Sequence, residues 1–222
     1  LEFIPYLASK GIVSIDNSSA FRMDKNVPLI VPEINADVLT EKDKIIANPN
    51  CSTIQAVVAI NPIYKKYGVK RIVYSTYQAV SGAGKKGIDD LTNTLLGKEP
   101  NKFLYPIANN CIPHIDDFTD SGYTKEEIKM IEETKKILRD DELKITATTV
   151  RVPVLNSHSE SINVELNKPF ELSDVLELLE NEKGIVLYDD VQNFKYPLAT
   201  IVDGKDEVFV GRVRRDYSLE SG

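Results

Sequence analysis

Short β-rich runs alternate with amphipathic helical runs along the whole chain, and this alternation constrains the fold more than any other feature. The run VKRIVYSTYQAV at 69–80 is rich in β-branched and aromatic residues, which is typical of a strand. The run at 124–140 instead repeats apolar residues at helical spacing and begins with the capping box Thr124-x-x-Glu127. The interleaving predicts an α/β or α+β fold in which helices cover one open sheet.

The remaining segments fit the same layout. Strands are predicted for the segments IVSID, KIIA, LKITATTVRVPV, ESINVEL and EVFVGRVRR. Helices are predicted from Cys51 to about Pro62, where the proline should kink or end the helix, over IDDLTNTLLG, and over DVLELLENEKG with Ser173 as its cap. The segment VPLIVPEIN is predicted to be extended, and residues 98–123 to be irregular. Because the strands after residue 144 are close in sequence, we expect a mixed or antiparallel sheet there.

The composition argues against several classes of protein. The 222 residues are 42% hydrophobic and 27% charged, which is typical of a globular protein. No window approaches the roughly 18 uninterrupted apolar residues that a membrane span needs. A net charge of −7 argues against a nucleic-acid-binding surface, and two cysteines are too few for a disulfide framework, so we expect a reducing cytoplasm. The opening LEFIPYLASKG is predicted to be a helix tail with its glycine stop, and we expect the chain to be a portion of a larger protein.

A cysteine stands at the start of a predicted helix in the segment ANPNCSTIQA. At that position Cys51 would lie beside unpaired backbone amides at the positive end of the helix dipole, which predicts a lowered thiol pKa. The same amides could stabilise an oxyanion on a substrate carbonyl. The alternative is that Cys51 is a small buried hydrophobic residue, as free cysteines commonly are.

A nucleophilic cysteine needs a base, and the chain offers two histidines. His158 lies in the polar loop NSHSES between two predicted strands, whereas His114 lies in CIPHID, where packing or a structural hydrogen bond is expected. We therefore favour His158. A zinc site made of both cysteines and both histidines is the alternative, but the scattered positions of Cys51 and His158 are unlike the close ligand pairs of zinc modules.

Two further features suggest a site for an anion or a cofactor. Arg151 enters a predicted strand with apolar neighbours, so it needs an anionic partner, either a protein carboxylate or a ligand. The SGAG segment at 81–84 could cradle phosphate or let a cofactor ring approach the backbone, but a plain strand-to-helix turn explains it as well. Lys129, taken singly, fits a solvated helical face.

Seven motifs occur in a characteristic order along essentially the whole chain: IDNSSAFR, NPNCSTIQ, YQAVSGAG, IPHID, EEIKMIEETKKIL, RVPVLNSHS and VFVGRVRRD. Their order and approximate spacing resemble the aspartate-semialdehyde dehydrogenase family. The resemblance implies that residues 1–50 are the tail of a Rossmann-type nucleotide-binding domain. Residues 51–222 would be a mixed-sheet catalytic and dimerisation domain of the glyceraldehyde-3-phosphate dehydrogenase-like type, truncated at its C-terminal end. The family's glycine-rich dinucleotide turn would precede residue 1, so this segment does not tell NADP from NAD.

The resemblance also implies roles for individual residues. The catalytic set would be the nucleophile, the acid/base residue and the residue that orients the reacting carbonyl: Cys51, His158 and Gln78. The substrate would be held by two phosphate ligands, a pocket-lining amide, an amine-binding glutamate and a carboxylate-binding arginine: Arg22, Lys129, Asn50, Glu127 and Arg151. The nicotinamide would rest against Ser81, Gly82, Ala83 and Gly84. His114 becomes a structural residue, and no metal is expected.

The implied activity is the reductive dephosphorylation of L-aspartyl 4-phosphate to L-aspartate 4-semialdehyde, through a cysteine thioester and with hydride from NADPH. The implied enzyme is a cytoplasmic homodimer or homotetramer of lysine, threonine and methionine biosynthesis that binds neither nucleic acid nor membranes. Three alternatives remain. One is another acyl-phosphate reductase, such as N-acetyl-glutamyl-phosphate reductase, whose cysteine turn typically contains Pro-Gly-Cys-Tyr. The others are a cysteine hydrolase and a non-catalytic dimerisation fragment.

Overall fold

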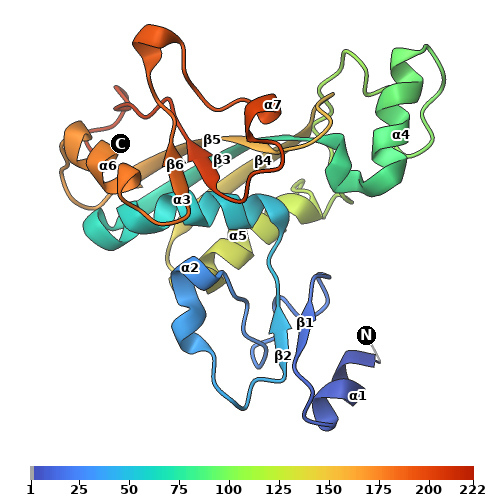
Figure 1. Cartoon of the computed structure of the whole chain (residues 1–222), viewed down its shortest axis with the longest axis horizontal. Coiled ribbons are helices and arrows are strands. Elements are labelled where there is room, and N and C mark those ends of the chain that lie inside the picture. The colour runs from blue at the N-terminus through green and yellow to red at the C-terminus, as the bar shows by residue number, and fades with distance from the viewer. Residues whose placement is uncertain (1–2) are drawn as a thin grey trace.

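The computed structural model describes residues 3–222, and their chain forms a small N-terminal unit and a larger unit built on a three-stranded sheet (Figure 1). The N-terminal unit comprises, in chain order, α1 (Phe3–Ser9), β1 (Ser14–Asp16), α2 (Pro32–Asn35), the 3-10 helix η1 (Ala36–Val38) and β2 (Ile45–Ala47). The elements that follow in the first half of the larger unit are α3 (Cys51–Tyr67), β3 (Val69–Gln78), η2 (Val80–Ala83) and α4 (Gly84–Leu95). The second half contains α5 (Lys125–Leu138), β4 (Lys144–Arg151), β5 (Ser159–Leu166), α6 (Leu172–Glu180), β6 (Ile185–Leu187), η3 (Val191–Asn193), α7 (Ala199–Val202) and β7 (Val208–Val210).

In the N-terminal unit, the two predicted strands are confirmed as β1 and β2, and they form a parallel pair. The predicted glycine stop after α1 is confirmed, because Gly11 has a φ of +78°, a conformation that favours glycine. The extended prediction for VPLIVPEIN is wrong in its second half. Pro32 occupies the first turn of α2, where the missing amide of proline costs nothing because that amide has no intrahelical partner.

The larger unit is organised by β3, which lies between two other strands. It runs parallel to β4 and antiparallel to β5, so the sheet is mixed, as predicted. The strands β4 and β5 are consecutive in the chain but do not pair with each other, because β3 separates them. The prediction of one open sheet is wrong: within residues 3–222 the strands form three small sheets, β1–β2, β4–β3–β5 and β6–β7.

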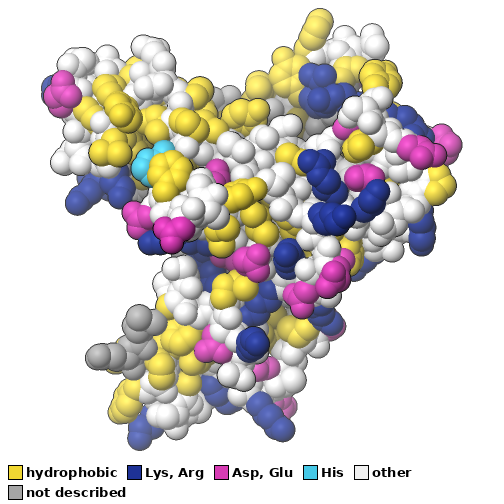
Figure 2. Space-filling model, turned by 180° about the vertical axis from the view of Figure 1, so that it is seen from behind, with side chains coloured by type: hydrophobic (Ala, Val, Ile, Leu, Met, Phe, Trp, Pro, Cys, Tyr) yellow, Lys and Arg dark blue, Asp and Glu magenta, His cyan; other side chains and the backbone are white. Residues whose placement is uncertain are grey.

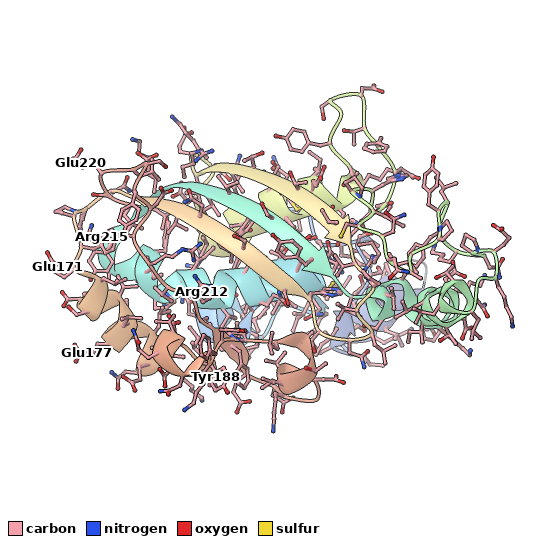
Figure 3. The ribbon with its side chains drawn as sticks, turned by 90° about the horizontal axis from the view of Figure 1, so that it is seen from above. Glu171, Glu177, Tyr188, Arg212, Arg215 and Glu220 are labelled. Carbon is pink, nitrogen blue, oxygen red and sulfur yellow. The ribbon has the colours of Figure 1, made fainter. Side chains whose placement is uncertain are left out.

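The helices α3 and α5 cover one face of this sheet (Figure 3). The alternating burial along β3 buries Ile72 and Tyr74 completely against these helices, while Tyr77 on the opposite face is 47% exposed. The helix α3 continues five residues past Pro62, so the expectation that it might end there is wrong. Pro62 and its neighbours are buried in the core, and this packing outweighs the lost backbone hydrogen bond.

The helix α4 and residues 98–113 form an arm beside the sheet with a small hydrophobic core of its own (Figure 1). The buried Asp90 accepts hydrogen bonds from three consecutive amides of the following loop at 2.7–2.9 Å, which fixes this irregular segment to α4. Hydrophobic side chains gather on the arm in the reverse view (Figure 2). The most exposed of them are Leu95, Leu96, Leu104 and Tyr105.

The C-terminal part packs around α6 and along α3. The N-cap of α6 is Glu171 and not the predicted Ser173, and the predicted last strand is shortened to the three residues of β7. Arg215 lies over the ring of Phe170 at 4.2 Å and holds the chain end near α6 (Figure 3). None of the helices in the described chain combines the length and hydrophobicity that crossing a membrane requires.

Candidate active site

The cysteine turn is held by a network of buried hydrogen bonds at the start of α3. Asn50 is the N-cap, and its Oδ1 accepts hydrogen bonds from the amides of Ser52 and Thr53 at 2.9 and 3.3 Å. Its Nδ2 donates to Glu126 Oε1 at 2.9 Å, and its backbone amide donates to Glu133 Oε2 at 2.6 Å. The polar groups of Asn50 are therefore used to shape the turn, and Cys51 follows as the first residue of the helix, exposed to solvent.

The prediction of a lowered thiol pKa is wrong for this structure. Although Cys51 is exposed, desolvation by the surrounding protein raises its pKa, and the Glu126 carboxylate raises it further. The Ser52 amide and the Arg151 guanidinium oppose this shift but do not reverse it. The Cys51 thiol at the start of α3 is therefore protonated at neutral pH as long as the Glu126 carboxylate beside it keeps its full charge.

The ends of three strands bring the other predicted catalytic residues together. The register of the parallel strands places Gln78 beside Arg151, and β5 begins directly after His158. The backbone amide of Ala79 donates to His158 Nδ1 at 3.0 Å, which fixes the imidazole at the end of β3. Gln78 is buried and its Nε2 donates to Glu126 Oε1 at 3.1 Å. Desolvation and the neighbouring Arg151 lower the pKa of His158 to about 4, so the ring is neutral.

Arg151 is buried, with 5% of its surface exposed, and is only partly satisfied by the protein. Its Nη1 donates to the carbonyl of Ala79 at 2.6 Å, but its Nε has no hydrogen-bond partner within residues 3–222. Desolvation lowers its pKa, and the charges of Glu126 and Cys51 counteract this effect. A buried guanidinium with an unpaired donor costs free energy unless an acceptor completes it, so this side chain is suited to bind a carboxylate.

The structure places Glu126, and not the predicted Glu127, at the cysteine turn. Glu127 uses Oε2 to accept from the Thr124 amide at 2.8 Å and Oε1 to accept from the Thr149 amide at 2.9 Å. Both oxygens are therefore committed to the capping box and to β4. Glu126 instead faces the cysteine turn and contacts Lys129 Nζ at 3.4 Å. The carboxylate that acts on the thiol, the guanidinium and the imidazole is that of Glu126.

The two predicted phosphate ligands are already paired with protein groups. Arg22 is buried, forms an ion pair with Glu133 at 3.1 Å and donates to two backbone carbonyls at 2.9 and 3.0 Å. Lys129 is less buried and forms a 2.6 Å ion pair with Asp116. Desolvation tends to lower the pKa of Lys129, but Asp116 and Glu126 raise it overall, so it stays charged.

The predicted cofactor loop, Ser81–Gly84, lies directly against the catalytic groups. A Cβ atom on Gly82 would lie 3.0 Å from His158 Nε2 and 3.0 Å from Arg151 Nη1, so a larger residue would displace both side chains. Gly84 has a φ of +72°, and no atom of the described chain lies within 4 Å of its Cβ position. The loop therefore presents bare backbone next to the imidazole, which fits the approach of a flat ring.

His114 and Cys111 lie outside this group of residues. The His114 ring stacks on Phe118 with centroids 4.5 Å apart, which agrees with the structural role expected for it. Cys111 is an exposed free thiol. No cluster of three or more metal-ligating side chains occurs in the part of the chain that the structure describes.

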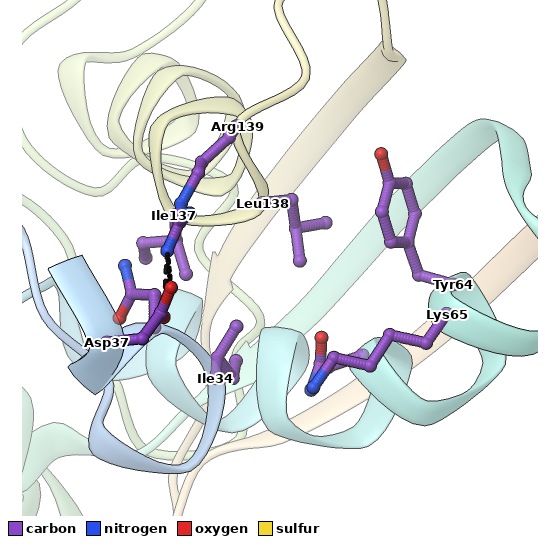
Figure 4. A pocket seen from close by; sticks show the side chains of 9 residues that line it. Ile34, Asp37, Tyr64, Lys65, Ile137, Leu138 and Arg139 are labelled. Carbon is purple, nitrogen blue, oxygen red and sulfur yellow. Dashed lines mark hydrogen bonds and ion pairs between the residues drawn. The ribbon is translucent and has the colours of Figure 1, made fainter.

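The structure also contains a groove that does not include this site (Figure 4). A groove of about 380 Å³ lies between α3 and α5, with the Asp37–Arg139 ion pair at its rim. Cys51 and His158 are not among its lining residues. The candidate catalytic residues therefore lie outside this groove.

Sequence reasoning missed three positioning residues. Gln55 lies one turn after Cys51, and its Nε2 donates to Glu160 Oε1 at 2.8 Å and approaches the carbonyl of His158 at 3.4 Å. It thereby joins the cysteine helix to the histidine loop. Glu133 joins α5 to the cysteine turn. The available signal was the placement of charged residues at Glu133 and Glu160 on faces that are otherwise apolar.

Comparisons with known proteins agree with this arrangement. A family model described as the semialdehyde dehydrogenase dimerisation domain matches residues 60–222, and one described as the semialdehyde dehydrogenase NAD binding domain matches residues 1–42. The aspartate-semialdehyde dehydrogenase of Aquifex aeolicus is 52% identical over 230 residues, which cover all of this chain and 68% of that protein.

Solved structures give the same result. The aspartate semialdehyde dehydrogenase II of Vibrio cholerae matches with a TM-score of 0.95 at 47% identity, over 99% of this chain and 68% of that one. Its structure in complex with ASA matches with a TM-score of 0.94 at 47% identity, over 99% of this chain and 67% of that one. The chain thus spans about two thirds of the length of these relatives, and it belongs to the aspartate-semialdehyde dehydrogenase family.

Proposed function

We propose that this chain carries the chemical steps that convert L-aspartyl 4-phosphate to L-aspartate 4-semialdehyde, within the biosynthesis of lysine, threonine and methionine. The observation that carries the proposal is the buried Arg151 with its unpaired Nε, next to the cysteine thiol and the neutral His158. A carboxylate-binding group beside a nucleophile and an imidazole suits an acyl phosphate that also bears an α-carboxylate.

The substrate's two ends would meet complementary groups. The α-carboxylate completes the guanidinium of Arg151, and the α-ammonium pairs with Glu126. Lys129 would hold the phosphate by exchanging its partner Asp116. Arg22, whose three nitrogens are all paired, would support the phosphate end through Glu133 and the cysteine turn. This assignment replaces Glu127 with Glu126 and keeps the other predicted substrate ligands, with Asn50 acting through the shape of the turn.

Substrate binding would also activate the nucleophile. The Glu126 carboxylate is one of the two causes that raise the pKa of Cys51, and the ammonium group of the substrate neutralises that carboxylate. The thiolate is then favoured next to Arg151. Its sulfur attacks the acyl carbon, the bond from carbon to the phosphate oxygen breaks, and a thioester remains on Cys51.

The proposed cofactor is NADP, and the backbone of Ser81–Gly84 would hold its nicotinamide end. The bare surface at Gly82 and Gly84 fits such a ring beside His158. When bound, the nicotinamide supplies the hydride that reduces the thioester. The residues of this chain contribute the thioester on Cys51 and the polar groups around its carbonyl, with Gln78 orienting Glu126 from the strand end.

The proposal is tested by covalent labelling of the purified chain. Freshly prepared L-aspartyl 4-phosphate should add one aspartyl group to Cys51, detected by mass spectrometry, with release of one equivalent of phosphate. The Cys51→Ala variant should show neither event, and Cys111→Ala should behave as the unmodified chain. Labelling at Cys111, or none at all, would contradict the proposal, and phosphate release that continues without limit would support a hydrolase.

A second substrate separates the nearest alternative. N-acetyl-L-glutamyl 5-phosphate lacks the free ammonium that would pair with Glu126, so it should label Cys51 much more slowly. Faster labelling by this compound would favour an N-acetyl-glutamyl-phosphate reductase.

We further propose a domain boundary at residue 50, a homodimer or homotetramer, and a cytoplasmic location. The start of α3 at Cys51 supports the boundary. The sheet face that helices leave uncovered and the exposed residues of the α4 arm support association of subunits. Two free cysteines fit a reducing compartment.

A further inference from the structure

We propose that Asp116 is a specificity-determining residue, whose carboxylate occupies Lys129 in the unliganded chain and disfavours free phosphate relative to a phosphate that is joined to an amino acid. The inference rests on the proposed function, which makes Lys129 a phosphate ligand. It depends on the ion pair between Lys129 Nζ and Asp116 Oδ2, which measures 2.6 Å.

The ammonium of Lys129 faces more negative charge than it can balance. Its Nζ pairs with Asp116 at 2.6 Å and also contacts Glu126 Oε2 at 3.4 Å. Burial tends to raise the pKa of Asp116, but the hydrogen bonds from Lys129 and from the next backbone amide lower it overall, so this carboxyl is ionised at neutral pH. One ammonium beside two carboxylates repels an approaching phosphate.

The two carboxylates differ in how firmly they are held. Glu126 is buried, and its Oε1 accepts hydrogen bonds from Asn50 and Gln78 at 2.9 and 3.1 Å, which ties it to the cysteine turn and to β3. The Asp116 side chain is 33% exposed. Within residues 3–222 its only other hydrogen bond comes from the adjacent backbone amide, at 2.9 Å. Asp116 is therefore the partner of Lys129 that a phosphate can displace.

The backbone directs Asp116 toward Lys129. Asp116 has a φ of +67°, a conformation that residues other than glycine rarely adopt. The segment is fixed on both sides of this residue, because Ile115 is buried and the Asp117 carbonyl accepts from the Lys125 amide at 2.8 Å. A loop held in an unfavourable conformation beside a binding group is typical of functional sites.

The site should therefore distinguish two kinds of phosphate. Free phosphate meets Lys129 with both carboxylates in place and binds weakly. The acyl phosphate of an amino acid brings an α-ammonium that pairs with Glu126 and an α-carboxylate that binds Arg151. These contacts hold the phosphate at a high effective concentration, so it can displace Asp116.

The test is calorimetric titration of the purified chain with inorganic phosphate at constant ionic strength. The Asp116→Asn variant removes the charge, keeps an oxygen that can accept from Lys129, and introduces a residue that tolerates a positive φ. We expect this variant to bind phosphate about 10-fold more tightly than the unmodified chain, because a repelling charge beside the anion is gone. Adding Lys129→Met to the variant should abolish the gain.

Asp117→Asn is the matched control, because it removes the same charge one residue along the chain. Asp117 pairs with Lys125 at 2.7 Å, and the two side chains are 77% and 55% exposed, so solvent screens this pair and phosphate affinity should change far less. An unchanged affinity in Asp116→Asn, or an equal gain in Asp117→Asn, would overturn the inference. A gain that persists in the double variant would overturn it as well.

The inference and the proposed function can fail separately. Labelling of Cys51 by the acyl phosphate tests the function, whereas the phosphate titration does not involve the thiol. A chain that is labelled at Cys51 but shows no gain in Asp116→Asn would retain the function and lose only the specificity role of Asp116.

Discussion

The two halves of the site differ in how completely the protein satisfies their ionisable and amide side chains; the Ser52 and Thr53 hydroxyls in the first turn of α3 also lack a partner in residues 3–222. In the helical half, between α3 and α5, Asn50, Glu127 and Glu133 have their oxygens bound to backbone amides or to charged partners. In the strand-end half, Arg151 keeps an Nε without a partner in residues 3–222, and His158 presents its Nε2 at a bare glycine.

This difference separates scaffold from ligand-binding groups. Buried charged groups are costly when unpaired, so the guanidinium of Arg151, which keeps an unpaired Nε beside Cys51, is suited to a ligand that completes it. The helical half therefore fixes the position of Cys51, and the strand-end half receives the substrate. Substitutions in the first half should act mainly on folding, and those in the second mainly on ligand binding.

The largest expected effect is the loss of stability when the buried ion pair between Arg22 and Glu133 is broken. Glu133→Ala leaves the buried Arg22 without its partner and should lower the free energy of unfolding by about 3–5 kcal/mol, measured by urea denaturation. Glu132→Ala is the matched control, because that neighbouring side chain is 46% exposed and its ion pair is long, at 4.0 Å. Equal losses in both variants would contradict the scaffold role.

The next effect is a dependence of stability on pH. Burial raises the pKa of Glu160 to about 8 from its ordinary 4.5, so between these values the folded state holds a proton that the unfolded state has lost. Stability should therefore fall by roughly 2–4 kcal/mol as pH rises through this range. Glu160→Gln keeps the acceptor for Gln55 and should remove this fall. Parallel stability curves for the two proteins from pH 5 to 8 would contradict the shift.

A smaller effect is expected on ligand capture. Arg151→Lys should weaken binding of L-aspartate, a non-reactive carrier of the α-carboxylate and ammonium, by about 10- to 100-fold, because one ammonium cannot form a bidentate pair. Calorimetric titration measures this affinity. Arg139→Lys is the control, since that residue lines the separate groove and should leave binding unchanged. Unchanged affinity in Arg151→Lys would remove the carboxylate-binding role.

The smallest effects distinguish two adjacent glutamates. Glu127→Ala breaks the capping box and should cost about 1–2 kcal/mol of stability while leaving Cys51 as reactive as before. Glu126→Gln removes a charge that raises the pKa of Cys51, so alkylation by iodoacetamide at pH 8 should become faster. Faster alkylation in the Glu127 variant and not in the Glu126 variant would reverse the assignment.

The sequence was sufficient for the elements with strong local signals. The capping box at Thr124 and the helix start at Cys51 are present in the structure, and the strand predicted over 69–80 forms β3 over 69–78. Local reasoning failed where tertiary packing decides the outcome, as at Pro62, which stays helical in the core, and at β3, which inserts between consecutive strands.

The site was predictable to the same extent. Motifs identified Cys51, Arg151 and His158, but the resemblance could not tell Glu126 from Glu127, because adjacent helical residues differ by about 100° in direction. The raised pKa of the Cys51 thiol results from burial and from the Glu126 carboxylate, which is distant in sequence. A local sequence pattern therefore cannot predict it.

The contrast between a satisfied and an unsatisfied arginine is the central claim, and nitrogen NMR of the arginine side chains tests it directly. Arg22 Nε already donates to the Asn48 carbonyl at 2.9 Å, whereas Arg151 Nε has no partner in the described chain. On saturation with L-aspartate, the Arg151 Nε signal should shift strongly and the Arg22 Nε signal should stay in place. A shift of Arg22 with an unmoved Arg151 would contradict the account.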